Sequence, residues 1–221
     1  LLENNNKPTI STYHEDLQFY REMPAYQYKA FTPHKIEKMK KVFISYSKDD
    51  LEIVMSFIHS LQTLVLQNTI EQPWFCTYLA PGDEVHNKIR EKMHEADIVC
   101  FMCSNNFFRT QYIIDHELKP TLKRKNEGSQ QIILPIVIDR VKWIIDNPDV
   151  NLGKFSGFPY RGKPVSSFYN WNDAWYVTNW FLEEVIKKNL VNDENFFDII
   201  TKLPSDIEDL IISQIKGDLN K

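Results

Sequence analysis

What the chain lacks narrows its class before any motif is considered. No apolar run approaches the roughly 20 residues that a membrane-spanning helix needs, and no signal peptide, internal repeat or low-complexity segment is visible. Neither a GxGxxG fingerprint nor a P-loop occurs, so no coenzyme bound in the Rossmann manner is expected. The histidines form no HExxH motif or ligand cluster, so no metal site is predicted.

Cysteine is scarce, and its placement argues against disulfides. Cys76, Cys100 and Cys103 all lie in predicted buried strands, and their odd number is typical of free thiols in a reducing cytoplasm. The spacing of Cys100 and Cys103 could indicate a redox or metal pair. Side chains in a strand alternate between faces, however, so these two thiols should point to opposite sides.

Charge is nearly balanced, because the chain has 26 Lys and Arg residues and 30 Asp and Glu residues, which give a net charge of −4. Such a chain has no overall field that would attract nucleic acid or anionic lipid, so neither is an expected partner. The chain begins with Leu1 rather than Met, which suggests a fragment or a chain without its first segment.

Predicted strands alternate with predicted helices along the chain. Apolar runs predict strands over residues 41–46, 74–77, 97–103 and 132–138, and helical spacing predicts helices over residues 49–67, 85–93, 110–125 and 171–190. The alternation predicts an α/β fold with a mostly parallel, doubly wound sheet. Pro135 places its strand at a sheet edge or ends it, and Asp49 or Asp50 is a candidate N-cap.

One carboxylate stands out by its position. Glu117 lies about two turns into the helix that follows the buried strand 97–103. In parallel α/β sheets, the region beyond the carboxyl ends of the strands forms the binding crevice. The alternative is that Glu117 is an ordinary residue of a helix surface.

Four stretches, in order over residues 41–190, resemble a TIR domain of the bacterial type. They are Val42-Phe43-Ile44-Ser45-Tyr46-Ser47-Lys48-Asp49-Asp50, Leu79-Ala80-Pro81-Gly82-Asp83, Ser104 to Tyr112 with Glu117-Leu118, and Leu134-Pro135-Ile136-Val137 with Trp143 and Gly162-Lys163-Pro164-Val165. The resemblance implies a flavodoxin-like sheet of about five strands. Residues 1–40 and 191–221 fall outside it and are expected to be partly helical extensions, the second split by Pro204.

In NAD-cleaving members of this family, a Glu of the third helix cleaves the bond between nicotinamide and ribose, and the resemblance gives Glu117 this role. Thr110 and Tyr112 stand seven and five residues before Glu117. In the common form, a Ser and a Trp stand one residue closer to the Glu, as if a residue were inserted here and the helix phase changed. Thr77 and Ala80 also replace acidic residues that occur in some members.

A single carboxylate is sufficient for this chemistry. Nicotinamide in NAD⁺ is already a cationic pyridinium and leaves as a neutral base, so no general acid is needed, unlike in ordinary glycosidases. A charged stabiliser of the oxocarbenium-like transition state is worth about 3–4 kcal/mol in other enzymes. We therefore expect an ionised Glu117, and NAD⁺ as a consumed substrate rather than a cofactor.

Further residues are expected to contact the substrate. Backbone amides at the end of the first strand and the Lys48 ammonium could meet phosphates, although the serines there could instead satisfy turn hydrogen bonds. Phe107, Phe108, Tyr112 or Trp143 could stack on a base, with core packing as the alternative for each; Tyr112 is expected to be the exposed one and His116 a bystander. The predicted substrate-binding residues are Ser45, Tyr46, Ser47, Lys48, Ala80, Gly82 and Tyr112.

The resemblance implies an NAD⁺ nucleosidase of anti-phage defence that yields nicotinamide and either ADP-ribose or a cyclic isomer. It also implies activation by self-association, in which the turn at Pro81 and Gly82, called the BB loop, helps to shape a neighbour's site. A sensor domain or partner protein would supply the trigger. The alternatives are a non-catalytic module that signals by TIR–TIR docking, an enzyme for another nucleotide, and an effector that interferes with host TIR signalling.

Overall fold

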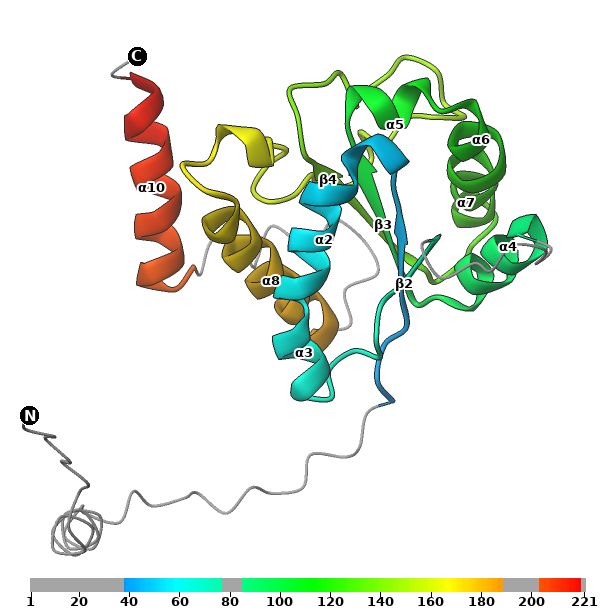
Figure 1. Ribbon diagram of the computed structural model, residues 1–221, viewed down its shortest axis with the longest axis horizontal. Coiled ribbons are helices and arrows are strands. Elements are labelled where there is room, and N and C mark those ends of the chain that lie inside the picture. The colour runs from blue at the N-terminus through cyan, green and yellow to red at the C-terminus, as the bar shows by residue number, and fades with distance from the viewer. Residues whose placement is uncertain (1–37, 77–84, 189–202, 220–221) are drawn as a thin grey trace, which may run out of the picture. The chain divides into compact units, whose positions relative to one another are not determined.

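The computed structural model describes residues 38–76, 85–188 and 203–219 (Figure 1). The chain divides into the unit Leu1–Lys38 and the unit Met39–Lys221, and the description below concerns the second. The predicted N-terminal extension, the residues Thr77 to Gly82 and the first helical piece of the C-terminal extension lie outside the described residues.

Four strands form one parallel sheet in the order β2-β1-β3-β4. They are β1 (Val42–Ser45), β2 (Trp74–Phe75), β3 (Ile98–Cys103) and β4 (Ile132–Val137). The chain places β2 on one side of β1 and then crosses to place β3 on the other side, so the strand order reverses between β1 and β3. This is the topological switch point of a doubly wound, flavodoxin-like sheet, and the predicted α/β fold is confirmed.

Alternating residues of the strands bury the two faces of the sheet in separate cores. Val42 and Ile44 pack with residues of α2 (Leu51–Ser60), α3 (Gln62–Leu66) and α8 (Trp171–Lys187). Phe43, between them, packs with residues of α4 (Val85–Glu95) and α7 (Lys119–Asn126). Figure 1 shows these two helical layers on either side of the strands.

The same alternation separates two of the cysteines. Cys100 belongs to the first core and Cys103 to the second, so the two thiols lie on opposite faces as predicted. Both are free and fully buried, and burial raises the pKa of Cys100 to about 12. Cys76 lies just beyond β2 and is only partly buried, which differs from the expectation that all three thiols sit inside strands.

The outer side of β4 explains how a proline fits inside a strand. Phe158 forms a single-residue parallel bridge with Ile136. The Phe158 N–H donates to the Pro135 carbonyl oxygen at 2.8 Å, and the Val137 N–H donates to the Phe158 carbonyl oxygen at 2.9 Å. Pro135 therefore turns its polar edge outward, and its missing N–H removes no bond to β3. Of about five expected strands, the described residues contain four, and the bridge at Phe158 lies on the outer side of β4.

The helices begin and end close to the predicted positions. The predicted helix 49–67 is divided into η1 (Lys48–Asp50), α2 and α3. Asn170 caps α8, because its side-chain oxygen accepts the Asp173 N–H at 2.9 Å. α10 (Ser205–Leu219) begins directly after Pro204, as predicted. Within the described ranges, no helix has both the length and the apolar character to span a bilayer.

Candidate active site

Glu117 points into the carboxyl edge of the sheet, at the switch point between β1 and β3. Its side chain is only 6% exposed. Its Oε2 accepts a hydrogen bond of 2.5 Å from the Oγ of Ser45, the last residue of β1. Glu117 is therefore not an ordinary surface residue of a helix. Ser45 is its partner, which is a different role from the turn hydrogen bonds considered for this serine.

A π-helical turn aims Glu117 at this edge. The helix that carries it consists of α6 (Gln111–Ile113), the π turn η3 (Ile114–Leu118) and α7. In a regular α-helix, residues five apart point about 140° from each other, whereas residues four apart differ by about 40°. A π turn takes up one additional residue. Tyr112 and Glu117 thus share a face although they are five residues apart, and the inserted residue does not turn the carboxylate away.

The sequence contains a physical reason for the π turn. Pro120, at the start of α7, has no N–H and cannot pack under the carbonyl four residues earlier, so a regular helix is interrupted here. Ile113, directly before the turn, and Leu118, its last residue, are both buried and fix the phase of the two flanking segments. Pro120 together with the lengthened spacing was the signal from which this turn could have been predicted.

Burial raises the pKa of Glu117 to about 7, and the Ser45 hydrogen bond opposes this rise. The carboxyl group is thus partly protonated near neutral pH. This differs from the expectation of a fully ionised Glu117, because sequence alone did not reveal how deeply the group lies. A cation placed beside it would favour the charged form.

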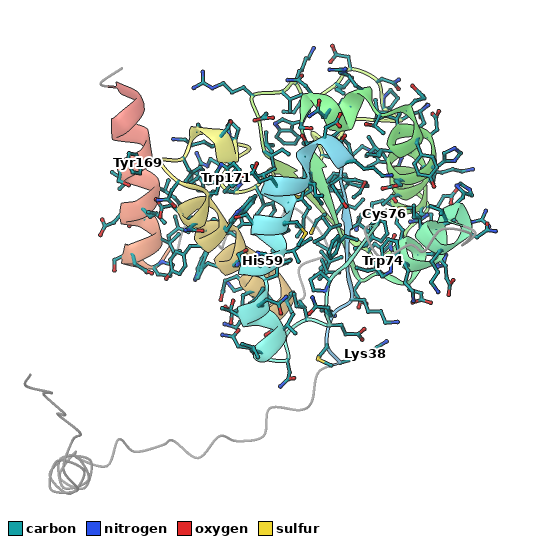
Figure 2. The ribbon with its side chains drawn as sticks, in the orientation of Figure 1. Lys38, His59, Trp74, Cys76, Tyr169 and Trp171 are labelled. Atoms are coloured by element: carbon teal, nitrogen blue, oxygen red, sulfur yellow. The ribbon has the colours of Figure 1, made fainter. Side chains whose placement is uncertain are left out.

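Tyr112 and Cys76 share this environment. Tyr112 is 37% exposed, as expected for the exposed aromatic residue. The pKa of its hydroxyl is raised by burial and then by the charges of Glu117 and Cys76. The pKa of the Cys76 thiol is raised by burial and by Glu117, and it is lowered by the charge of Lys48. Cys76, at the end of β2 (Figure 2), is a site residue that the sequence analysis missed.

A second network joins the loops that follow β1 and β3. Asp50, a candidate N-cap of α2, makes no side-chain cap bond. Its carboxylate instead accepts hydrogen bonds from Ser104 Oγ at 2.5 Å and Asn106 Nδ2 at 2.8 Å. The hydroxyl oxygens of Thr110 and Ser47 lie 3.4 Å apart, within hydrogen-bond distance. These contacts hold the two loops together around the Glu117–Ser45 pair, and sequence reasoning missed Asp50 because its partners are distant in the chain.

The other predicted residues are placed differently. The Tyr46 ring packs in the core against Phe75, with ring centroids 6.5 Å apart, so its side chain is engaged there. Lys48 is exposed. Phe107 is fully buried, so it packs in the core and does not offer a surface for stacking on a base. Ala80 and Gly82 lie outside the described residues.

Trp143 also serves packing. A Cβ at Gly162, which has a φ of +72°, would lie 2.7 Å from Trp143 Cζ2. A Cβ at Gly157 would lie 2.8 Å from the same atom. The indole therefore rests on two residues where only glycine fits, which agrees with the packing alternative considered for it.

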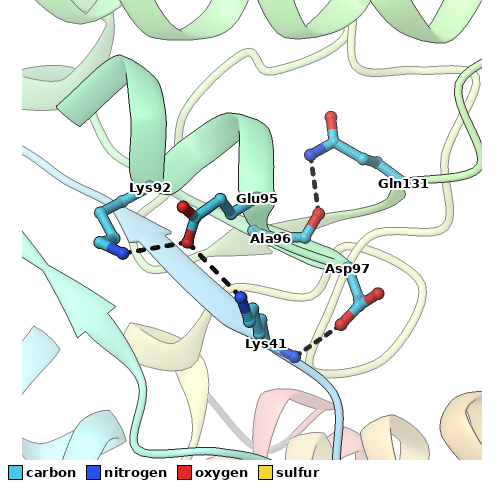
Figure 3. Close-up of polar contacts among 6 residues, drawn as sticks. All are labelled: Lys41, Lys92, Glu95, Ala96, Asp97 and Gln131. Carbon is cyan, nitrogen blue, oxygen red and sulfur yellow. Dashed lines mark hydrogen bonds and ion pairs between the residues drawn. The ribbon is translucent and has the colours of Figure 1, made fainter. Parts of the chain in front are cut away.

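One pocket lies at the opposite, amino edge of the sheet. It is lined by Lys41, Val42, Glu71, Gln72, Trp74, Lys92, Glu95 and Ala96. Lys41 and Lys92 both pair with Glu95 there, at 3.5 and 3.0 Å (Figure 3). Because these charges already neutralise one another and the switch point is elsewhere, Glu117 rather than this pocket marks the candidate site. In the described part of the chain, no three His, Cys, Asp or Glu side chains gather to hold a metal ion.

Comparison with known sequences agrees with this fold. A sequence model of the TIR domain matches residues 42–164, more than half of the chain, and the protein belongs to the TIR domain family. The chain is also similar to the uncharacterized protein y4lF of Sinorhizobium fredii (strain NBRC 101917 / NGR234), with 26% identity over 136 residues. The aligned part covers 62% of this chain and 40% of that protein, so less than half of the relative's length is matched.

Proposed function

We propose that the protein cleaves the nicotinamide–ribose bond of NAD⁺, with Glu117 as the catalytic carboxylate. The observation that carries the proposal is the buried Glu117–Ser45 pair at the switch point of a TIR fold. Ligands of doubly wound sheets bind at this edge. A buried carboxyl group with a raised pKa in such a place is a candidate functional group with a stated physical cause.

The reaction needs charge stabilisation rather than proton donation. The pyridinium of NAD⁺ beside Glu117 would lower the pKa of the carboxyl group and so bring it into its ionised form. Ser45 holds Oε2, and we assign Oε1 to a ribose hydroxyl. As the bond to nicotinamide breaks, the electron pair leaves with the neutral base, and the carboxylate stabilises the positive charge that develops on the ribose. Water then bonds to the ribose carbon that nicotinamide has left and releases one proton to solvent, or an atom of the same nucleotide bonds to that carbon and closes a ring.

The surrounding residues would bind the rest of the substrate. The Tyr112 ring is proposed to pack on nicotinamide, and Ser47 and the exposed Lys48 are proposed to meet the phosphates. We extend the proposal to the biological role expected of bacterial TIR domains, which is NAD⁺ depletion or signalling in anti-phage defence. Activity would take place in the cytoplasm and increase when TIR domains associate through their BB loops.

Nicotinamide release measured by chromatography tests the proposal. Purified protein, at concentrations that favour self-association, should release nicotinamide from NAD⁺. Glu117→Ala should lower the rate at least about 100-fold. Glu95→Ala is the matched control, because it removes a glutamate carboxylate from the other edge of the sheet. This variant should keep the activity. If the unmodified protein releases no nicotinamide at any concentration, the docking alternative replaces the enzymatic one.

A further inference from the structure

Three aromatic rings from two separate helices meet next to Glu117. His86, in the first turn of α4, lies edge-on to His116 of the π turn, with ring centroids 4.7 Å apart. The rings of Tyr112 and His116 lie 4.8 Å apart, and those of His86 and Tyr112 lie 6.0 Å apart. The Tyr112 hydroxyl and His86 Nδ1 form a hydrogen bond of 3.1 Å. The cluster therefore joins α4 to the helix that carries the carboxylate.

The cluster restricts the side-chain conformation of the exposed Tyr112. A tyrosine with more than a third of its surface exposed has several rotamers open to it, and ordering it on substrate binding costs conformational entropy. His86 holds the hydroxyl end, and His116 holds one ring face. The phenol, whose pKa responds to the charge of Glu117, is thereby fixed beside the carboxylate before any ligand arrives.

We propose that His86 is a positioning residue, which acts on the substrate only through Tyr112. The inference rests on the proposed function, since it names what orients the ring on which nicotinamide packs. His86 contributes one hydrogen bond, which pre-organises the ring and so favours binding. Loss of that bond should weaken binding of NAD⁺ by roughly three- to tenfold, the range of a single neutral hydrogen bond, and should leave kcat nearly unchanged.

Steady-state kinetics with five variants test the proposal. His86→Phe keeps a ring and loses the hydrogen bond, whereas His86→Asn is shorter and keeps a hydrogen-bonding group. Tyr112→Phe removes the other partner of the same bond. We expect His86→Phe and Tyr112→Phe to raise KM to a similar extent, His86→Asn to recover part of the loss, and the double Phe variant to be no worse than either single one. His94→Phe, exposed on the same helix, is the control and should match the unmodified protein.

A second measurement does not depend on turnover. In protein with labelled tyrosine rings, the Tyr112 signal is identified by its loss in Tyr112→Phe. We expect His86→Phe to shift that signal and His94→Phe to leave it in place. NAD⁺ added to Glu117→Gln should move the Tyr112 signal at a lower concentration than it does when His86→Phe is also present.

The outcomes separate the two proposals. If the unmodified protein cleaves NAD⁺ but the effects of His86→Phe and Tyr112→Phe multiply, or His86→Phe leaves the Tyr112 signal unchanged, His86 does not act through Tyr112 and this inference is wrong. If neither the unmodified protein nor any variant releases nicotinamide, the proposed function fails instead. In that case the ring signals still decide whether His86 holds Tyr112.

Discussion

Glu95 and Glu117 lie at opposite edges of the same parallel sheet, and their surroundings differ in every respect that matters for a carboxylate. At the amino edge, the exposed Glu95 accepts from Lys92 and Lys41, and the hydrogen bond and charge of Lys92 lower its pKa. At the carboxyl edge, Glu117 is buried, and burial raises its pKa. Within the described residues, it accepts a hydrogen bond from the uncharged side chain of Ser45.

The rest of the amino edge is also arranged for stability. The Lys41 N–H donates to Asp97 Oδ2 at 2.8 Å. Near the end of α4, Gln131 Nε2 donates to the Ala96 carbonyl oxygen at 2.8 Å (Figure 3). The same nitrogen donates to the Met93 carbonyl oxygen, also at 2.8 Å. These bonds satisfy carbonyls that the end of a helix leaves without a partner. One edge thus satisfies its polar groups, whereas the other retains a carboxyl group whose charged form is unfavourable, which is typical of a functional site.

The largest expected effect is on stability. Because the pKa of Glu117 is higher in the folded chain than its ordinary value of 4.5, the folded state binds more protons, and stability falls as pH rises from about 4.5 to about 7. Glu117→Gln removes this penalty, and we expect it to stabilise the protein at pH 8 by roughly 3 kcal/mol. The gain should vanish below about pH 4.5. Urea unfolding at several pH values measures it.

Glu95→Gln is the matched control for stability. The pKa of Glu95 is lowered in the folded chain, so its contribution is present above the unfolded pKa and is lost as pH falls. We expect a small destabilisation at neutral pH, opposite in sign to that of Glu117→Gln. If the two variants changed the free energy of unfolding in the same direction at neutral pH, the contrast between the two edges would be contradicted.

The pH dependence of kcat/KM reports the same group through activity. The proposed reaction needs the ionised form of Glu117, so kcat/KM for NAD⁺ cleavage should fall about tenfold per pH unit below a midpoint of about 7. Ser45→Ala removes the hydrogen bond that lowers the pKa and should move the midpoint to higher pH. A midpoint that stays in place, or moves down, would show that Ser45 does not support the charged carboxylate.

The π turn can be tested by shortening it. Deletion of Asp115, a half-exposed residue of η3, combined with Pro120→Ala to remove the interruption, should convert the turn into a regular helix. Folding and nicotinamide release should both be retained, because the neighbouring segments keep their phase. Deletion of Lys123 from the regular part of α7 is the control and should reduce the melting temperature strongly, since it rotates buried residues out of register. Loss of activity in the Asp115 deletion would mean that the π turn does more than absorb a residue.

The smallest effect concerns Cys76. A maleimide should label this half-buried thiol in the native protein while the buried Cys100 and Cys103 stay unmodified. Because the charge of Glu117 raises the pKa of Cys76, Glu117→Gln should increase the labelling rate severalfold at neutral pH, and NAD⁺ should slow it. Mass spectrometry of peptides follows each cysteine. Equal labelling of all three thiols would contradict the placement of Cys76 at the site.

Sequence analysis predicted the strands, the layered fold and the edge position of Pro135, because each depends on local apolar patterning. It also predicted that Glu117 lies at the carboxyl edge of the sheet, since the carboxyl ends of parallel strands define a common edge, and the structure places the residue there. It did not predict how Glu117 is aimed, because the π turn depends on Pro120 and on anchors packed elsewhere. Asp50 was one of two candidate N-caps, yet its carboxylate accepts hydrogen bonds from Ser104 and Asn106, more than 50 residues away. No local sequence pattern predicts such a pairing.

Pro135 has a consequence for how copies of this chain can meet. An exposed edge strand normally invites another strand to add to it. Here Phe158 occupies the outer side of β4, and the proline offers an incoming strand no amide hydrogen at that point. Strand addition is therefore blocked at this border, and copies of this chain that meet here must do so through side-chain surfaces.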